Sequence, residues 1–385
     1  MARPAPRRDH RTDEIVVALP HVQAVRERLP RGGAGAVEES EVLGLARVPL
    51  PPGEDASGAL ERLRAGFRAD HAGWAPTMGK NRLVDRVVGG GKISYGGGGA
   101  PQAVAPPGWA PRSAGPGRGV RVGVLDTGLV PQPWLGGGWY ARYSDADPGA
   151  VGSPTAADGH ATFVAGLVLS QAPGATVEVR RVLERDGSAD SWTVATAIAE
   201  FGRQGMDVLN LSFLCTTDDG EPPLALAAAV DRLDPDIVVV AAAGNHARAG
   251  RAGEPAWPAA LDDVVAVGAA QDGEGTPAGF SPVEPWVDLL APGVDLVSTF
   301  LSGRIDVGGD GDARTEEFHG WARWSGTSFA AALVSGAVAA ATDPGRTSAH
   351  AAYDDIRRAL ARRPLARGAA GRPLPPYLPL RVPEG

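Results

Sequence analysis

Three short segments of the chain each place a reactive side chain next to small residues. Asp126 ends an apolar run, His160 precedes a stretch of small apolar residues, and Ser328 follows a Gly-Thr pair at the start of another such stretch. Taken singly, each has a structural interpretation: a strand-to-turn aspartate, a structural histidine and a helix N-cap serine. Taken together, they are the parts of a serine hydrolase, because the serine needs a base and the base needs a carboxylate. The order Asp, His, Ser is one of three unrelated orders in which this triad occurs.

A fourth segment supplies a hydrogen-bond donor for such a reaction. The apolar run at 238–243 ends in Gly244 and Asn245, a pair that also forms ordinary turns. Beside a serine nucleophile, the Asn245 amide is predicted to donate to the oxyanion of the tetrahedral intermediate, together with the backbone N–H of Ser328. A helix that begins at this serine adds the positive end of its dipole.

These residues need a scaffold that brings the ends of several elements together. Beyond residue 118, near-continuous apolar runs alternate with helical stretches, a pattern typical of a parallel sheet covered by helices. The expected fold class is α/β, with a mostly parallel sheet, helices on both faces and the functional residues at the carboxyl ends of strands. The predicted strands span 120–125, 177–182, 208–213, 237–242 and 264–267, and the predicted helices span 161–169, 191–203, 224–233 and 353–363.

The chain before residue 118 divides into two parts. Residues 1–88 alternate a strand, a helix, a strand and a helix, which predicts a small N-terminal α+β unit. Residues 89–117 are rich in glycine and proline and are interpreted as a linker. The third region, 118–385, ends in a proline-rich tail. The four elements expected in the first unit span 14–19, 22–29, 41–49 and 56–67.

Composition excludes several other classes of protein. The formal net charge of −8 argues against nucleic acid or an anionic membrane as the main partner. The single cysteine, Cys215, cannot form an internal disulfide, and we expect it to be a small buried residue rather than a redox switch. No apolar run has the length of a membrane span, and no apolar stretch of signal length follows the arginines near the start. The expected location is therefore the cytoplasm, and export by another route is the alternative.

Other hydrolytic chemistries fit the sequence less well. Asp126 also begins an Asp-Thr-Gly triplet, but an aspartic protease needs a second such carboxylate, and the chain has no other Asp-Thr-Gly or Asp-Ser-Gly. The seven histidines show no HExxH spacing, which argues against metal hydrolysis. A phosphate loop around 89–92 fails because Arg86 stands where the first glycine of that pattern belongs.

The segments occur in one order: VGVLDTG, DGHATFVAG, VLNLSF, AAAGN and SGTSFAAALVSG. With these motifs the chain resembles the subtilisin-like serine proteases, the subtilase family, over roughly residues 118–365. The resemblance implies a subtilisin-like fold and an endopeptidase that acts through an acyl-enzyme. It also implies a role for each of four residues: Ser328 as nucleophile, His160 as general base and then acid, Asp126 as its orienting carboxylate, and Asn245 as oxyanion donor.

The resemblance further implies where a substrate binds. Ser212, Phe213 and Leu214 correspond to an edge strand that pairs with the substrate backbone and, with Gly244, lines the first specificity pocket. The family generally has Ser-Leu-Gly in this segment, so Leu214 replaces a glycine. Leu214 is expected either to narrow the pocket or to displace the peptide, and the sequence indicates no preferred substrate residue.

Partners and cofactors follow from the same resemblance. Polypeptides are the expected substrates, and no cofactor is required. Family members often bind structural calcium, but the two acidic stretches at 145–147 and 306–312 are expected to be exposed loops, so no metal site is assigned. Residues 1–88 are expected to be either an inhibitory or chaperone-like propeptide or an accessory domain that stays attached. The alternative for the whole chain is a catalytically silent subtilase-fold binding module.

Overall fold

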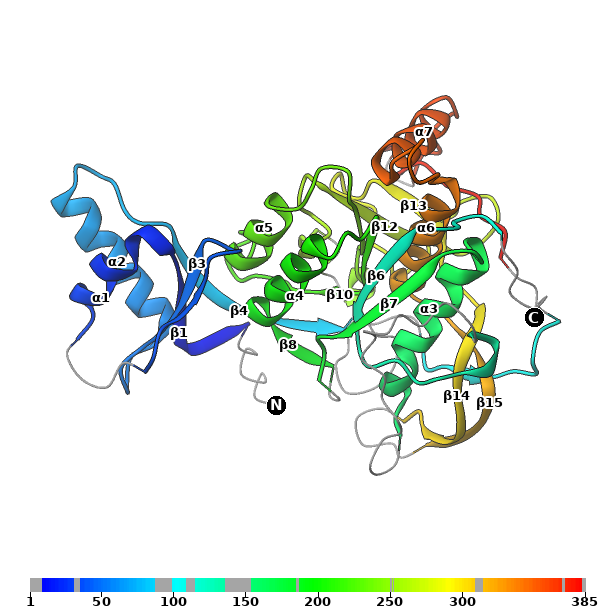
Figure 1. The fold of residues 1–385 in the computed structure, drawn as a ribbon, viewed down its shortest axis with the longest axis horizontal. Helices are drawn as coiled ribbons and strands as arrows, with labels where there is room; N and C mark the ends of the chain where they lie inside the picture. Colours follow the sequence, from blue (N-terminus) through cyan, green and yellow to red (C-terminus); the bar gives the residue numbers. More distant parts are fainter. Residues whose placement is uncertain are drawn as a thin grey trace.

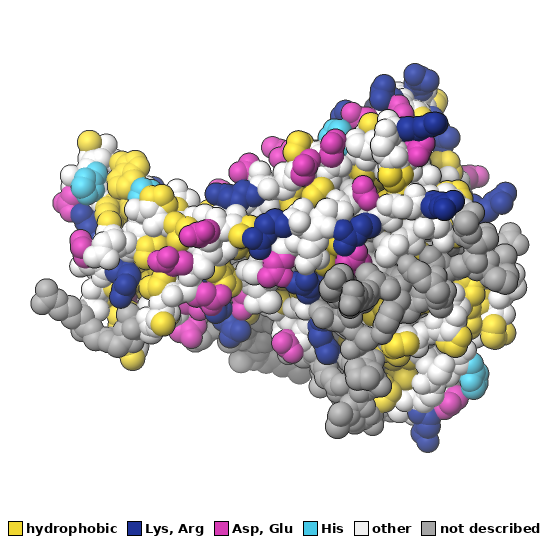
Figure 2. Space-filling view, in the orientation of Figure 1, with side chains coloured by type: hydrophobic (Ala, Val, Ile, Leu, Met, Phe, Trp, Pro, Cys, Tyr) yellow, Lys and Arg dark blue, Asp and Glu magenta, His cyan; other side chains and the backbone are white. Residues whose placement is uncertain are grey.

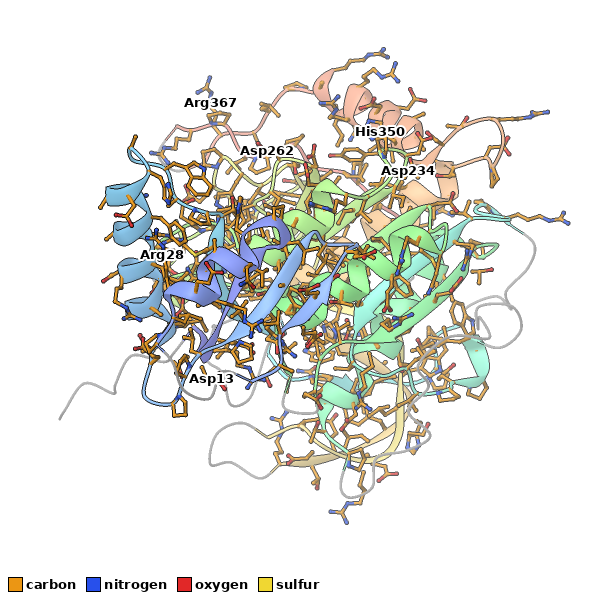
Figure 3. The ribbon with its side chains drawn as sticks, turned by 60° about the vertical axis from the view of Figure 1, so that its left-hand side comes forward. Asp13, Arg28, Asp234, Asp262, His350 and Arg367 are labelled. Carbon is orange, nitrogen blue, oxygen red and sulfur yellow. The ribbon has the colours of Figure 1, made fainter. Side chains whose placement is uncertain are left out.

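The computed structural model describes most of the chain in two lobes of unequal size (Figure 1). The smaller lobe holds the N-terminal unit, and the larger one holds the region after residue 118. Figure 3 marks the first lobe by Asp13 and Arg28 and the second by Asp234, Asp262 and His350. The described residues are 9–30, 35–86, 99–108, 115–135, 154–184, 187–249, 251, 253–308, 314–368 and 371–382.

A parallel sheet forms the centre of the larger lobe. Its six strands run in the order β13-β12-β11-β9-β6-β7, and every neighbouring pair is parallel. The α/β prediction is therefore confirmed, and the five strands predicted in this region correspond to strands of the sheet, except that the strand predicted at 208–213 leaves it after Leu211. The bounds are β6 (Arg121–Asp126), β7 (Thr176–Arg181), β9 (Val208–Leu211), β11 (Val238–Ala242), β12 (Val264–Ala270) and β13 (Leu289–Pro292).

Helices cover both faces of this sheet, as predicted. Helices α3 (His160–Gln171) and α6 (Thr327–Ala341) share one apolar cluster with Val122 and Val124. Helices α4 (Ser191–Arg203) and α5 (Leu224–Asp231) share a second cluster with Leu125 on the opposite face. The two faces alternate along β6 because successive strand residues point in opposite directions. Helix α7 (Ala349–Ala361) begins before the predicted residue 353 because Ser348 caps it, accepting from Ala351 N at 3.3 Å.

An antiparallel sheet that the sequence did not predict lies beside α3. The hairpin strands β14 (Leu296–Asp306) and β15 (Thr315–Trp324) pair with each other, and β15 also pairs with the short strand β5 (Gln102–Ala103). Strand β5 belongs to the predicted linker, so this part of the linker is a strand docked on the larger lobe rather than a loose segment.

The N-terminal lobe is an α+β unit, as predicted. Strand β1 (His10–Ala18) pairs antiparallel with β3 (Leu45–Pro49) and with β4 (Met78–Arg86). Helix α2 (Ala56–Asp70) lies in the same lobe as α1 (Val22–Arg28), and Asp55 caps α2 through its carboxylate.

One prediction for this lobe is wrong. The strand expected at 41–49 is a hairpin of β2 (Glu38–Ser40) and β3, because residues 41–44 form a turn that ends at Gly44 with a φ of 63°.

None of the helices in the described part of the chain is both long enough and apolar enough to cross a membrane.

Candidate active site

The predicted carboxylate and histidine meet in the interior of the larger lobe. Asp126 ends β6 and His160 opens α3, and His160 Nδ1 lies 2.8 Å from both carboxylate oxygens of Asp126. Neither residue is exposed. A carboxylate only accepts hydrogen bonds, so Nδ1 carries the proton and Nε2 presents its lone pair. His160 Nε2 is buried and has no hydrogen-bond partner among the described residues. This is the arrangement required of a general base.

Local structure fixes the position of each member of this pair. The backbone N–H of Thr127 donates to Asp126 Oδ1 at 2.6 Å, and the Thr127 hydroxyl accepts from Ala161 N at 3.3 Å. One turn before His160, Thr155 and Asp158 form a capping box that starts the helical segment. The end of β6 and the start of α3 are thereby held together.

Aromatic rings enclose the histidine. The centroid of the His160 ring lies 5.7 Å from that of Trp324 and 5.4 Å from that of Phe329. Phe163 in turn packs against both of these rings. Neither the role of Trp324 nor this cluster is predicted from the sequence. The rings exclude water from one side of the imidazole and limit its rotation.

Ser328 is the second residue of α6 and is fully buried. Asn245 Oδ1 accepts from the backbone N–H of the preceding Thr327 at 3.0 Å and from the Thr327 hydroxyl at 3.1 Å. The residue after the serine, Phe329, carries the ring that contacts His160. Ser328 therefore lies between a residue bound to Asn245 and a residue packed on His160, which brings all four predicted catalytic residues to one place.

The two ends of the Asn245 amide differ in their surroundings. The oxygen is occupied by Thr327, whereas Nδ2 is buried and has no hydrogen-bond partner within the described part of the protein. A Cβ atom on Gly326, just before the α6 helix, would lie 3.4 Å from this nitrogen. The free donor thus faces the start of the helix that carries Ser328.

The predicted substrate-binding residues adjoin this centre. Phe213 and Leu214 form the short strand β10 (Phe213–Leu214), and Ser212 Oγ donates to the backbone carbonyl of Ser328 at 3.4 Å. Gly244 has a φ of 95°, a left-handed conformation that favours glycine, and its N–H donates to the Thr327 hydroxyl at 3.0 Å.

Asn210 and Ser335, which were not predicted from the sequence, connect the end of β9 to α6. Asn210 Nδ2 donates to Ser212 Oγ at 2.8 Å, and Asn210 Oδ1 accepts from Ser335 Oγ at 3.0 Å. All three side chains are fully buried. The network ties the α6 helix to the strand segment that contacts Ser328. Cys215, which follows β10, is buried as expected.

Strand β4 of the N-terminal lobe occupies the edge at which a substrate is expected. It pairs antiparallel with β10, with Arg86 opposite Phe213 and Asp85 opposite Leu214. On its other side it pairs antiparallel with β8 (Ser188–Asp190). The strand is therefore inserted between two strands of the larger lobe. Its partner Phe213 directly follows Ser212 in the sequence.

Polar contacts reinforce this insertion. Asn81 is buried and accepts from Ser191 Oγ at 2.9 Å and from Trp192 N at 3.1 Å, at the first residues of α4. Trp192 Nε1 donates to Glu38 Oε1 at 2.8 Å, and this bond lowers the pKa of Glu38. The first turn of α4 is thus satisfied in part by the N-terminal lobe.

A cluster of charges joins the two lobes at the same strand. Arg82 donates to Asp9, Asp218 and Asp219, with a distance of 2.6 Å to Asp218, and Lys80 Nζ lies 2.8 Å from the same aspartate. Burial alone would raise the pKa of Asp218, but the bonds from Lys80 and Arg82 outweigh it and hold that pKa below its ordinary value. We call these five residues the charge clamp.

The charge clamp also accounts for the one metal-like cluster in the described part of the chain. Asp9, His10 and Asp218 could each offer a ligand atom to an ion. The guanidinium of Arg82 already binds both aspartates, which does not fit a cation site.

Of the two acidic stretches considered for calcium, 145–147 lies outside the described residues, and so does 309–312 of the stretch 306–312. Asp306, which is described, ends β14 and accepts from Gly308 N at 2.9 Å.

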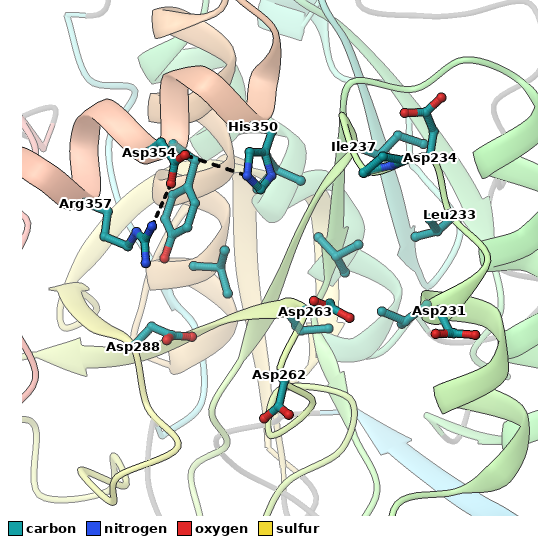
Figure 4. A pocket seen from close by; sticks show the side chains of 17 residues that line it. Asp231, Leu233, Asp234, Ile237, Asp262, Asp263, Asp288, His350, Asp354 and Arg357 are labelled. Atoms are coloured by element: carbon teal, nitrogen blue, oxygen red, sulfur yellow. Dashed lines mark hydrogen bonds and ion pairs between the residues drawn. The ribbon is translucent and has the colours of Figure 1, made fainter.

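A cavity of about 410 Å³ lies away from this centre (Figure 4). It opens at the amino ends of β11 and β12, whereas Asn245 follows the carboxyl end of β11. Its polar lining includes Asp288, whose pKa burial raises, and Asp354, which lies 3.0 Å from Arg357. The sheet separates this cavity from the predicted catalytic residues.

Comparisons with known proteins identify relatives of the chain. Residues 117–362 match the model described as the subtilase family. The chain is 34% identical over 197 residues to the thermostable alkaline protease of Halalkalibacterium halodurans, covering 49% of this chain and 51% of that protein. It is 32% identical over 232 residues to subtilisin Savinase of Lederbergia lenta, covering 58% of this chain and 76% of that protein. The chain therefore spans about half the length of the first of these relatives.

A solved structure extends the similarity of fold to both lobes. Fervidolysin from Fervidobacterium pennivorans aligns with a TM-score of 0.60 at 19% identity, covering 94% of this chain and 58% of that chain. At this identity the likeness concerns the fold alone. The family model, by contrast, matches more than half of the sequence, and its range contains every residue of the centre described above. The chain belongs to the subtilase family.

Proposed function

We propose that the protein is a serine endopeptidase that hydrolyses peptide bonds in polypeptides. The observation that carries the proposal is the buried Asp126–His160 pair, whose Nε2 has no partner among the described residues and whose ring packs on Phe329, the residue after Ser328. A binding module has no need of this pair together with an unoccupied asparagine donor. No cofactor enters the reaction, because side chains and backbone N–H groups supply every proton transfer and every charge stabilisation.

The reaction follows from the roles of these atoms. His160 Nε2 takes the proton of Ser328 Oγ while this oxygen attacks the peptide carbonyl carbon. The resulting oxyanion accepts hydrogen bonds from Asn245 Nδ2 and from the Ser328 backbone N–H. The imidazolium, stabilised by Asp126, donates its proton to the leaving amine, and an acyl-enzyme remains. Water then loses a proton to His160 and attacks the ester carbonyl. His160 gives this proton to Ser328 Oγ as the ester C–O bond breaks, which releases the acid and restores the serine hydroxyl.

Labelling with a fluorophosphonate probe tests this proposal. We expect the wild-type protein to be labelled and the Ser328→Ala variant to be unlabelled. Asp126→Asn is the second variant, and it should lower kcat by about 10⁴ because the histidine then adopts the wrong tautomer. If the wild type is not labelled even after the N-terminal lobe has been removed by limited proteolysis, the chain is a catalytically silent binding module.

We further propose that the N-terminal lobe inhibits the enzyme. The support is that β4 forms backbone hydrogen bonds with β10, the edge expected to bind substrate, so peptide and β4 compete for the same groups. Intact-mass analysis of wild type and Ser328→Ala separates the two expectations for this lobe. A propeptide predicts a shortened chain only in the wild type, whereas an attached accessory domain predicts equal masses apart from the substitution.

A further inference from the structure

The side chain of Leu214 lies beside Gly244, the residue that precedes the predicted oxyanion donor Asn245. Leu214 is 4% exposed, although it belongs to a two-residue strand at the edge of the predicted cleft. A Cβ atom on Gly244 would lie 3.1 Å from Leu214 Cδ2 and 2.5 Å from His246 Nδ1. Leu214 and His246 therefore both occupy the space beside Gly244. His246 is itself buried, with Nε2 donating to the Glu254 carbonyl at 3.0 Å, which fixes its position beside Gly244.

The pairing of β4 defines which way a substrate side chain points at this position. Strand β4 shows that an extended chain binds antiparallel to β10, opposite Phe213 and Leu214. In a substrate bound with this register, the residue after the one opposite Phe213 lies opposite Ser212. The Ser212 hydroxyl contacts the Ser328 carbonyl. Residues directly opposite each other in an antiparallel pair point to the same face, and residues two positions apart share a face. The side chain of that substrate residue thus points to the face on which Leu214 lies, toward Gly244.

The same pairing decides between the two expectations for Leu214. If this residue displaced the peptide, a strand could not pair with it in register with Phe213. Strand β4 does pair with both residues, with no shift between them. Leu214 is therefore compatible with a bound backbone, and its effect falls on the space beside Gly244.

We propose that Leu214 determines specificity by filling the space for the substrate side chain that precedes the scissile bond. The enzyme then cleaves after residues with small side chains, such as glycine, alanine and serine, and rejects large apolar and aromatic ones. This inference rests on the proposed function, because it concerns the carbonyl that Ser328 attacks. One methylene group in an apolar site changes kcat/KM by about 10–200-fold, so exchanging a leucine is sufficient to reverse a preference.

Two peptidyl phosphonate probes that differ only in the terminal residue, alanine or phenylalanine, test the inference. They are applied to the full chain, and the rate of serine labelling is measured. The N-terminal lobe slows both probes by the same factor, because both must displace β4, so the ratio of rates does not depend on its docking. We expect the wild type to favour the alanine probe at least tenfold and Leu214→Gly to gain at least tenfold toward the phenylalanine probe.

The matched control is Leu214→Met, which keeps the volume of the side chain and should keep the wild-type ratio. A wild type that reacts equally with both probes or favours phenylalanine overturns the inference, as does an unchanged ratio in Leu214→Gly. Leu214→Ala serves as a second enlarging variant in case Leu214→Gly does not fold, and the same tenfold criterion applies to it. If a plain fluorophosphonate labels the protein, these overturning results contradict only the proposed role of Leu214 in specificity. If it does not, the proposed function fails and the inference fails with it.

Discussion

At the scale of single residues, Asn245 combines a satisfied oxygen with a buried, unpartnered nitrogen. Asn245→Ala removes the donor while leaving the Asp126–His160 pair intact. We expect kcat to fall about 10²–10³-fold with little change in KM, the range known for loss of this donor in a subtilisin, because the bond forms only once the oxyanion develops. Steady-state kinetics with one peptide substrate measures both constants. A loss confined to KM would show instead that Asn245 only binds the substrate.

A second residue, Ser335, holds the nucleophile helix through Asn210. Ser335→Ala leaves Asn210 Oδ1 buried without its hydroxyl donor, and we expect the free energy of unfolding to fall by about 1–3 kcal/mol. Urea denaturation in the Ser328→Ala background measures this loss without self-digestion. The exposed Ser302→Ala is the control and should stay within about 0.5 kcal/mol of its parent. Equal values for the two variants would contradict the role of the network.

The residues that sequence reasoning identified are those with a local signature. Asp126, His160 and Ser328 each follow or open an element within a motif of small residues. Asn210 and Ser335 have no such signature, because a polar side chain inside an apolar strand or helix acquires its partner only after the chain folds. His246 was missed for the same reason: its packing on Gly244 depends on a left-handed backbone that no residue pattern predicts.

At the scale of elements, β4 is the strand that joins the two lobes. Its Arg82 is buried, and Arg82→Gln removes a charge that three aspartates share. Because two of these aspartates are about half exposed, we expect the docking of β4 to weaken by only about 1–2 kcal/mol, which is roughly 5–30-fold in the equilibrium for opening. Hydrogen exchange of the β4 and β10 amides in the Ser328→Ala background measures this change.

The control for this prediction is Arg62→Gln, since Arg62 forms an ion pair with Glu54 that lies within the N-terminal lobe. It should leave the exchange of both strands unchanged. If Arg82→Gln also leaves them unchanged, the charge clamp does not contribute to docking and the strand pairing alone holds β4.

The central elements were predictable because their signals are local and strong. Strands buried on both faces are continuous apolar runs, and this pattern identified β6, β7, β9, β11 and β12. Strand β4 lacks such a run: MGKNRLVDR is mostly polar, and its burial comes from strands on both sides and from the charge clamp. Strands β14 and β15 carry exposed polar residues in their outer halves, so they were not recognised as a hairpin.

At the scale of the whole molecule, the two lobes share one apolar cluster. Val16, Leu45 and Val84 of the N-terminal lobe belong to the cluster that also contains Ile198 of α4 and Leu226 of α5. The space-filling view shows the N-terminal lobe projecting from the larger one (Figure 2). The contact between the lobes therefore combines this apolar cluster with the charge clamp.

This arrangement predicts how acid changes the docking of the lobes. The pKa values of Asp9 and Asp218 lie below their ordinary value of 3.8 when the lobes are docked, because the hydrogen bonds of both carboxylates and the charge of Arg82 outweigh the effect of burial. After separation the pKa of Asp218 returns toward that value, because Lys80 and Arg82 leave with the N-terminal lobe, whereas Asp9 keeps its contacts with His10 and Arg82 inside that lobe. Groups with a depressed pKa stabilise the docked state fully above the ordinary pKa, and this contribution is lost as the pH falls through the lowered one. Docking should thus be constant from pH 8 to about 5 and weaken below about pH 4.

Small-angle X-ray scattering of the full chain in the Ser328→Ala background measures this opening as an increase in the radius of gyration. The apolar cluster persists at low pH, so the loss of the clamp is the pH-dependent part of the docking energy. Arg82→Gln removes the main cation of the clamp, and its radius should change less between pH 5 and pH 3 than that of its parent. An opening centred between pH 5 and 7 would point to histidine titration instead. Identical pH profiles for the two proteins would show that the charge clamp does not cause the pH dependence of docking.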